Sequence, residues 1–505
     1  MKYRFNWNFP IAFSKHDSSK LYTYSNHVHL STDEGHSWET ISPDLTRNDK
    51  SKLVSSGGPI TQDNTGVEYY ATIFAVDESP LQEGLIWVGS DDGLIHLTKD
   101  GGATWENVTP KKMPDWMMIN SIDASSFDSG TAYIAGTRYK LGDFTPYLYV
   151  TDDYGKNWKL ITDGIKDEHF TRVLRSDKVN KNILYAGTET GMYISYDRGN
   201  SWNEFQKNLP IVPITDLTIK DNSLIVATQG RSIWMIDDLT VFHQLTPSTD
   251  QIKLYKPKDS YRMGGAGGRK SLTAGTNLPN GAIIHYFIPN YDKENDQVSL
   301  SIHSADGTLI KEFSDKSKEN LLKVKNGGNS FVWNMKYPGA KRLDNMVLWG
   351  ADFTGAKAVP GNYIVKLKVN DTEMTQEFTI HKDPTSEGSI DDIKAQFDKA
   401  HKAIENIRSM KTNLKKFQSN YADNEFAKDL IEESKSIVES IDKIENELYQ
   451  TKNQSNQDPL NYGVKLTNNL GNLNSAFRGG DFGPTVQDVQ VKNELIEKVN
   501  AQLTK

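Results

Sequence analysis

The first half of the chain alternates short apolar runs with turns that contain Gly and Asp. The clearest unit spans 71–109, where the runs 72–76, 85–89, 94–97 and 104–108 are expected to form four strands. Short β-branched and aromatic runs separated by Gly and Asp-Gly turns are typical of strands. Runs similar to the second strand recur elsewhere, at 21–24, 132–136, 184–187 and 224–227. We therefore predict five repeating β-units over residues 1–248.

A short motif, [Ser/Thr]-x-Asp-x-Gly-x-x-Trp, occurs four times in this region. We call its copies, 31–38, 98–105, 151–158 and 195–202, the repeated turns. The Asp can accept hydrogen bonds from backbone N–H groups, the Gly can adopt a positive φ, and the Trp can bury a large ring between sheets. One such hairpin per unit is typical of a β-propeller. We assign these residues to the fold rather than to catalysis: Asp33, Gly35, Trp38, Asp100, Gly102, Trp105, Asp153, Gly155, Trp158, Asp197, Gly199 and Trp202.

The fifth unit, which ends at 230–238, lacks the motif. A propeller must close to remove its exposed sheet edges, and propellers with this motif commonly have six or more blades. We therefore expect an incomplete ring whose other blades lie in absent sequence or come from another chain. We favour a chain that lacks its N-terminal half.

The second half of the chain changes pattern twice. Residues 249–280 are rich in Gly, Lys and Pro and are expected to form a linker. Alternating runs over 281–384 predict an immunoglobulin-like β-sandwich. Apolar residues at helical spacing over 385–505 predict an α-helical hairpin or bundle.

Composition narrows the chemistry. The 505 residues are enough for more than one domain, and the net charge of −8 argues against a nucleic-acid surface. The chain has no Cys, so it can form no disulfide and has no Cys nucleophile. No apolar run approaches 18 residues, so we expect no transmembrane segment. We also expect no metal and no cofactor, because His27 and His29 share a strand face without a third ligand nearby and no phosphate-binding loop is present.

Several segments together resemble a known family. These segments are 56–61, 63–70, 101–105, 185–191, 230–238, 359–363 and 460–462. With them, the whole chain resembles the C-terminal half of the large secreted bacterial BNR-repeat (Asp-box) proteins usually named glycosyl hydrolase or sortilin-domain-like. The resemblance implies a longer protein with a signal peptide and an N-terminal propeller half, and an extracellular or periplasmic location. It also implies similarity to two-propeller xyloglucanase-like glycosidases and to the ligand-binding propeller of sortilin.

The candidate site residues follow from the position of the repeated turns. These turns mark one end of the blades, whereas ligand sites in such propellers use loops at the opposite end. Glycoside hydrolysis needs two carboxylates, for which the candidates are Asp63, Glu68, Asp91, Asp92 and Glu189. For the pair Asp91-Asp92, a role in turn formation is the alternative. The candidate substrate-binding residues are Tyr69, Tyr70, Trp116, Arg138, Tyr139, Asp143 and Arg231.

Two functions remain open on the sequence alone. The first is a secreted glycosidase that uses a carboxylate pair on the propeller face opposite the repeated turns. The second is a non-catalytic binding or assembly module for a carbohydrate or peptide ligand. Resemblance to a family named for an enzyme favours the first, and the absence of a recognisable catalytic motif favours the second.

Overall fold

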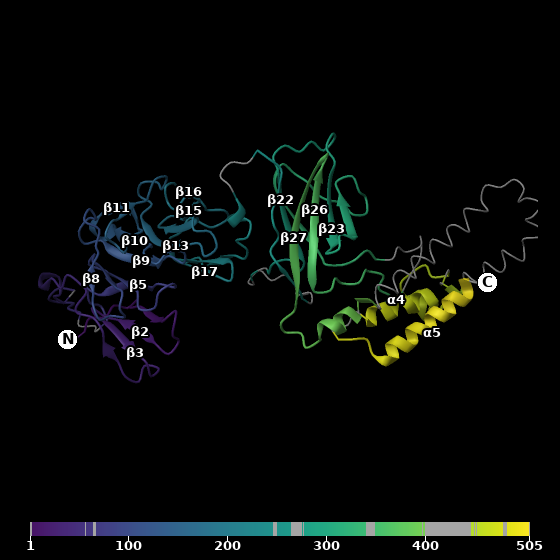
Figure 1. Ribbon diagram of the computed structural model, residues 1–505, viewed down its shortest axis with the longest axis horizontal. Helices are drawn as coiled ribbons and strands as arrows, with labels where there is room; N and C mark the ends of the chain where they lie inside the picture. The colour runs from purple at the N-terminus through teal and green to yellow at the C-terminus, as the bar shows by residue number, and fades with distance from the viewer. Residues whose placement is uncertain are drawn as a thin grey trace, which may run out of the picture. The chain divides into compact units, whose positions relative to one another are not determined.

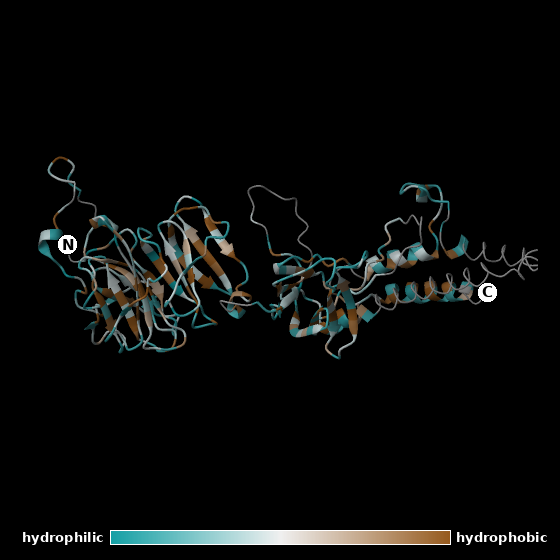
Figure 2. Cartoon of the chain, turned by 90° about the horizontal axis from the view of Figure 1, so that it is seen from above, coloured by the Kyte–Doolittle hydropathy of each residue, from teal (hydrophilic) through white to brown (hydrophobic). Residues whose placement is uncertain are grey.

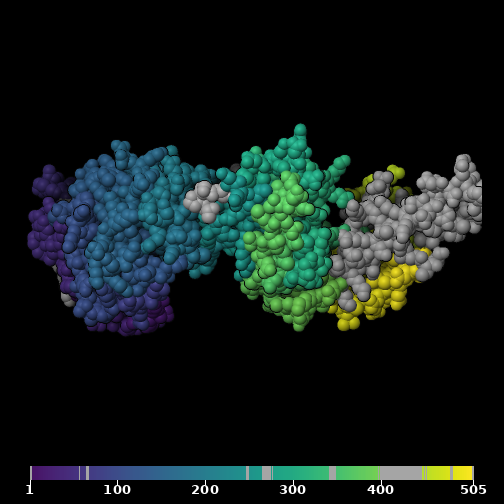
Figure 3. All heavy atoms as spheres, turned by 45° about the horizontal axis from the view of Figure 1, so that its top comes forward, coloured from purple at the N-terminus to yellow at the C-terminus, as the bar shows by residue number. Residues whose placement is uncertain are grey.

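The computed structural model describes residues 3–55, 57–63, 67–245, 250–263, 275, 277–339, 349–395, 397–398, 446–448, 450, 452–477 and 482–503. The chain divides into two compact units, Met1–Pro247 and Ser248–Lys505. The first runs from purple to blue-green in Figure 1, and the second from green to yellow. Figure 3 shows the same units as filled atoms.

The first unit consists of five antiparallel sheets that follow one another along the chain. Four have four strands each, and within every sheet neighbouring strands are consecutive in sequence. The strands are β1 Ile11–Phe13, β2 Leu21–Tyr24, β3 Val28–Ser31, β4 Glu39–Thr40; β5 Ile73–Glu78, β6 Ile86–Ser90, β7 Ile95–Thr98, β8 Glu106–Asn107; β9 Met118–Ala124, β10 Ala132–Arg138, β11 Asp143–Thr151, β12 Lys159–Leu160; β13 Thr171–Ser176, β14 Leu184–Thr188, β15 Met192–Ser195, β16 Asn203–Glu204; and β17 Ile214–Lys220, β18 Ser223–Thr228, β19 Ile233–Ile236. This is the strand order of consecutive propeller blades.

Each sheet packs face to face on the next through buried apolar side chains. Trp87 and Ile95 of the second sheet, for example, share a cluster with Ile119 and Ile134 of the third. Similar clusters join the first sheet to the second, the third to the fourth and the fourth to the fifth. Figure 2 shows hydrophobic residues, in brown, gathered in strands of this unit. None of the buried clusters among the described residues joins the first sheet to the fifth.

Glycines in the second strand of two sheets let the next sheet approach closely. A Cβ added at Gly89 would lie 2.4 Å from the Ile119 side chain, and one at Gly187 would lie 2.6 Å from Ile214. Neither distance is tolerable for a real Cβ, so these positions need Gly for packing rather than for a turn.

The repeated turns join the third and fourth strands of their sheets, and all four share one set of hydrogen bonds. In each, the Ser or Thr hydroxyl donates to the Asp carboxylate at 2.8 or 2.9 Å. The same hydroxyl accepts from the Gly amide at 2.8 to 3.0 Å. The carboxylate also accepts from the amide four residues on, at 2.8 or 2.9 Å. The turn thus satisfies its own backbone donors, as the motif predicts.

The Trp of a repeated turn ties its sheet to the preceding one. The indole N–H groups of Trp105, Trp158 and Trp202 donate to backbone carbonyls that follow the outer strand of the sheet before. Trp38 belongs to the first sheet and instead donates to Gly35 of its own turn, at 3.1 Å. Its side chain is 44% exposed, whereas that of Trp202 is 4% exposed.

The second unit contains a β-sandwich. One sheet has the order β20-β22-β25 and the other β21-β27-β26-β23-β24. The strands are β20 Lys253–Leu254, β21 Ser260–Arg262, β22 Ala282–Ile288, β23 Val298–Ser304, β24 Leu309–Ser314, β25 Gly327–Trp333, β26 Gly361–Val369 and β27 Thr372–Lys382. Both sheets contribute to one core, in which Trp333 is fully buried. The immunoglobulin-like assignment itself stays a prediction.

The expectation of a linker over 249–280 needs correction for residues 253–262. Strand β20 pairs with β22, and β21 runs parallel to β27. Leu254 is 3% exposed and belongs to the sandwich core. The Gly-, Lys- and Pro-rich composition of the stretch concealed these short strands because their partners lie far away in sequence.

Two helices, α4 Leu466–Ala476 and α5 Val486–Leu503, lie in contact with each other. Helix α4 packs on Phe353, and the Asn468 side chain binds both backbone groups of Trp349. Residues 399–445, which carry much of the predicted helical pattern, lie outside the described residues, so the bundle stays a prediction. Across the described part of the chain, no helix combines the length and apolar character needed to cross a membrane.

Candidate functional site

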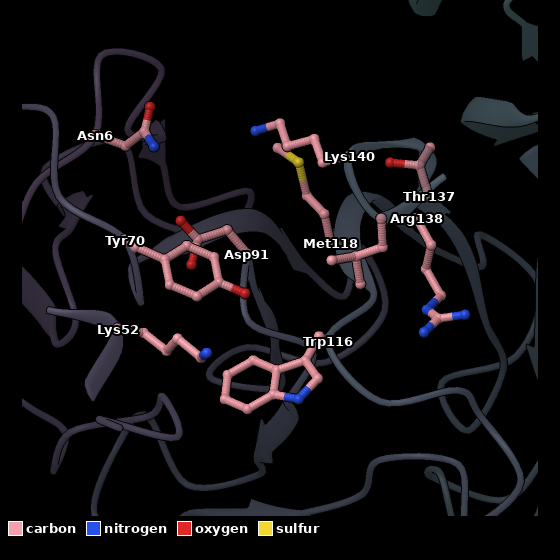
Figure 4. Close-up of a pocket in the computed structure, with 10 residues that line it drawn as sticks. Asn6, Lys52, Tyr70, Asp91, Trp116, Met118, Thr137, Arg138 and Lys140 are labelled. Carbon is pink, nitrogen blue, oxygen red and sulfur yellow. The ribbon is translucent and has the colours of Figure 1, made fainter. Parts of the chain in front are cut away.

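A pocket of about 330 Å³ opens in the first unit (Figure 4). It is lined by Asn6, Lys52, Tyr70, Asp91, Trp116, Met118, Thr137, Arg138, Lys140 and Leu141. Most of these residues come from the β4–β5, β6–β7, β8–β9 and β10–β11 connections. In an antiparallel meander these connections lie at the end opposite the β3–β4 type of turn. The pocket is therefore at the end opposite the repeated turns, and its volume is at the lower limit of small-molecule sites, roughly 300–1,000 Å³.

Four of the residues predicted from sequence meet in this pocket: Tyr70, Asp91, Trp116 and Arg138. The rings of Tyr70 and Trp116 are stacked, with centroids 6.4 Å apart and planes 28° apart. Two stacked aromatic rings beside polar groups form a surface on which a flat apolar ligand face can lie.

Trp116 is held in an unusual backbone conformation. Its φ is 61°, in the left-handed region that bulky residues rarely occupy. The Arg47 guanidinium lies 4.9 Å from the centroid of the indole ring, and the Lys52 ammonium lies 5.9 Å from it. Such a conformation persists only where the surrounding structure fixes it.

Arg47 fixes the loop that carries Trp116. Its backbone N–H donates to the Asp92 carboxylate at 2.8 Å, and its Nε donates to the Asp92 carbonyl at 2.9 Å. Its Nη2 pairs with Asp115, the residue before Trp116, at 2.9 Å. Burial raises the pKa of Asp92, whose carboxylate also accepts from the Ser90 hydroxyl at 2.6 Å. These contacts give Asp92 a structural role.

Asp91 forms part of the pocket wall and is only 6% exposed. Its carboxylate accepts from the Thr72 amide at 2.8 Å and from the Thr72 hydroxyl at 3.0 Å. Burial raises the pKa of Asp91 to about 7, against the effect of the Thr72 amide, and the neighbouring Asp92 adds to the rise. Asp91 thus exchanges a proton near neutral pH, which is a property of general acids and bases.

Arg138 enters the pocket with its charge already paired. Its Nη1 lies 2.6 Å from the Asp143 carboxylate, and its Nε donates to the Asp115 carbonyl at 3.1 Å. Burial opposes ionisation of Asp143, but hydrogen bonds from Thr145, Tyr147 and Arg138 outweigh it and lower the pKa to about 2. Asp143 is therefore a permanent anion that positions Arg138.

The other predicted residues do not line the pocket. Glu189 pairs with Arg172 at 2.6 Å, and that guanidinium lies 5.5 Å from the centroid of the Tyr139 ring. Glu68 accepts from the Trp7 indole at 2.7 Å, and the Tyr69 amide donates to Phe5. Asp63 lies in the β4–β5 loop, and Arg231 lies in the β18–β19 turn. Within the described residues, Asp91 is the one candidate carboxylate that contributes to the pocket lining.

Sequence reasoning missed Arg47, Lys52 and Lys140. Lys140 directly follows Arg138 and Tyr139, so extending the predicted 138–139 segment by one residue would have found it. Arg47 and Lys52 lie in a long loop whose local pattern gives no reason to select them. Their contacts reach residues 45 to 68 positions away in the chain.

The described residues contain no group of three or more His, Asp or Glu side chains suited to hold a metal ion. His27 and His29 are engaged in local contacts, with the Ser42 carbonyl at 3.0 Å and the Ser25 hydroxyl at 2.8 Å respectively.

No protein-family model matches the chain, and none of the curated proteins matches it significantly. Among solved structures it is similar to the GH74 xyloglucanase from Xanthomonas campestris, with 17% identity, 45% of this chain and 36% of that chain covered, and a TM-score of 0.35. An ancestral GH74 enzyme is 14% identical, with 62% of this chain and 39% of that chain covered and a TM-score of 0.35. The structure of YCF48 bound to D1 peptide is 19% identical, with 33% of this chain and 51% of that chain covered and a TM-score of 0.26. The matched region thus spans little more than a third to a half of each neighbour, and the fold assignment rests on the strand pairings above.

Proposed function

We propose that the first unit is a propeller-type platform that binds a carbohydrate in the pocket lined by Tyr70, Asp91 and Trp116. The stacked aromatic pair is the observation that carries the proposal. Its rings offer an apolar surface for one face of a sugar. The polar groups of Asp91, Thr137 and Arg138 line the same pocket and can bind hydroxyl groups.

Binding without hydrolysis is the function that the lining supports best. Glycosidases of the common kind use two carboxyl groups on either side of the scissile bond. Asp91 alone among the five candidate carboxylates lines the described pocket. Glu68, Asp92 and Glu189 accept hydrogen bonds or ion pairs elsewhere.

One observation favours a glycosidase as the second candidate. Burial keeps the Asp91 carboxyl partly protonated near pH 7, as a general acid requires. Its partner carboxylate would then come from further blades, which the family resemblance implies.

The resemblance is likewise the support for proposing that the protein acts in the periplasm or outside the cell.

The binding proposal is tested by calorimetric titration of the full chain with cellohexaose, a xyloglucan heptasaccharide and hexagalacturonate. Trp116→Ala should weaken binding of the best of these at least 10-fold, because it removes half of the aromatic surface. Trp38→Ala is the matched control, since it removes an exposed Trp at the opposite end of the blades. The proposal fails if none of the three sugars binds, or if both variants bind like the parent chain.

The same sugars distinguish the binding module from the glycosidase when the release of reducing ends is measured. A glycosidase should lose turnover in Asp91→Asn while still binding sugar. The Asn side chain can still accept the Thr72 amide, so the local geometry is kept. Binding by the parent chain with no release of reducing ends would leave the binding module as the function.

A further inference from the structure

We infer that the ligand of this pocket is an anionic carbohydrate, one that carries carboxylate or sulfate groups. The inference rests on the proposed function and specifies the class of sugar. It is carried by the balance of charges around the Tyr70–Trp116 pair, and by which of those charges already have partners.

The lining is rich in cations. Lys52, Arg138 and Lys140 contribute positive groups, and Asp91 is the one acidic residue among the lining residues. The chain as a whole is acidic, with a net charge of −8. A positive pocket on an acidic protein is a local reversal of charge, and such a reversal attracts anions to that site.

The two lysines have no ion-pair partner among the described residues, although Lys52 adds to the hydrogen bonds of Ser51 in lowering the pKa of Asp49. Arg138 is paired with Asp143 at 2.6 Å. For Lys52 and Lys140, by contrast, the described residues place no carboxylate within ion-pair distance, and both side chains are exposed. Lys140 acts on Asp91 electrostatically, but the two do not form an ion pair. Two ammonium groups thus remain available to a ligand.

Asp91 does little to cancel these charges. Burial raises its pKa to about 7, so a substantial fraction of the carboxyl groups is neutral at neutral pH. The carboxylate oxygens also face Thr72, which donates two hydrogen bonds to them. The pocket therefore presents a net positive charge to an incoming sugar.

Both lysines line the pocket that contains the Tyr70–Trp116 pair. The Lys52 ammonium is 5.9 Å from the centroid of the Trp116 ring, and Lys140 reaches the pocket from the η2 turn, Tyr139–Leu141 (Figure 4). A pyranose ring stacked on Trp116 would place its ring substituents within reach of Lys52. Substituents bearing carboxylate or sulfate would form charge-assisted hydrogen bonds there.

The test compares hexagalacturonate with its fully methyl-esterified form, which has the same backbone without the charge. A chondroitin 4-sulfate hexasaccharide distinguishes sulfate from carboxylate as the source of the anion. We expect the acid to bind at least 10-fold more tightly than the ester, or the sulfated sugar to do so. Raising the salt from 50 to 500 mM should weaken binding of the acidic sugar, because exposed charges are screened.

The double variant Lys52→Gln/Lys140→Gln should lose about 10-fold in affinity for the acidic sugar and clearly less in affinity for neutral sugars. Its control is Lys156→Gln/Lys181→Gln, which removes two exposed charges from the repeated-turn end. If the neutral ester binds as tightly as both the acidic and the sulfated sugar, or more tightly, or if the double variant is unchanged, the inference is overturned and the proposed function stands. If cellohexaose, the xyloglucan heptasaccharide and all acidic probes fail to bind, the proposed function itself fails.

Discussion

Asp91, at the pocket end of the first unit, and the aspartates of the repeated turns behave in opposite ways. At the repeated turns, Asp33 and Asp100 are exposed and accept hydrogen bonds from Ser or Thr, which lower the pKa of each to about 2. At the pocket end, burial raises the pKa of Asp91 to about 7. The same residue type is thus a fixed hydrogen-bond acceptor at one end and a titrating group at the other.

The structural and the functional features differ in how often they recur in the first unit. The hydrogen bonds of the repeated turns recur in four sheets, as a feature that serves folding would. The pocket lining occurs once: the stacked Tyr70–Trp116 pair and the buried Asp91 have no counterpart in the four repeated turns. The pocket end is therefore where chemistry specific to this protein is to be sought.

The largest expected effect is on stability at the repeated-turn end. Trp202→Ala removes a ring that is 4% exposed and a hydrogen bond to Ile161. We expect a loss of roughly 3–5 kcal/mol in the free energy of unfolding, measured with urea. Trp38→Ala removes an equivalent but half-exposed ring and should cost less than about 1 kcal/mol. Equal losses in the two variants would contradict the account of packing between sheets.

The next effect is a pH dependence at the pocket end. Between pH 4 and 7 the unfolded chain has lost the Asp91 proton while the folded chain retains it, so this group makes stability fall as pH rises. Asp91→Asn removes the contribution of this group to the pH dependence of stability. Relative to the parent, the variant should gain roughly 2–4 kcal/mol in unfolding free energy on going from pH 4 to pH 8. A difference between the two proteins that is independent of pH would show that Asp91 has an ordinary pKa.

The smallest effect concerns a single repeated turn. Asp197→Ala removes acceptors for the Ser195 hydroxyl and for the amide and hydroxyl of Ser201. We expect a loss of roughly 1–2 kcal/mol in unfolding free energy and unchanged sugar affinity. Asp197→Asn keeps one carbonyl acceptor and should lose less. A drop in sugar affinity in either variant would mean that the two ends are coupled.

Local pattern predicted much of the first unit. The repeated turns, the five sheets and the end at which a pocket lies follow from motifs of eight residues and from strand alternation. Tyr70, Trp116 and Arg138 could be nominated because they lie in loops at that end. The charge state of Asp91 could not be predicted, because it depends on burial by loops that are distant in sequence.

The features that local pattern did not predict have one cause. Glu189, a candidate acid, does not line the pocket and pairs with Arg172, 17 residues earlier. Residues 253–262 looked like linker because the partners of their strands are β22 and β27. Arg47 and Lys52 gave no local signal at all. Long-range pairing decides each of these cases, and a single sequence does not record it.

Hydrogen–deuterium exchange with and without a bound acidic hexasaccharide reports on both ends of the blades at once. If the pocket end binds the sugar, exchange should slow on binding in 47–53, 90–94, 115–118 and 137–142. Exchange should not change in the repeated turns, 31–38, 98–105, 151–158 and 195–202. Protection confined to the repeated turns would contradict the assignment of the pocket end as the functional end.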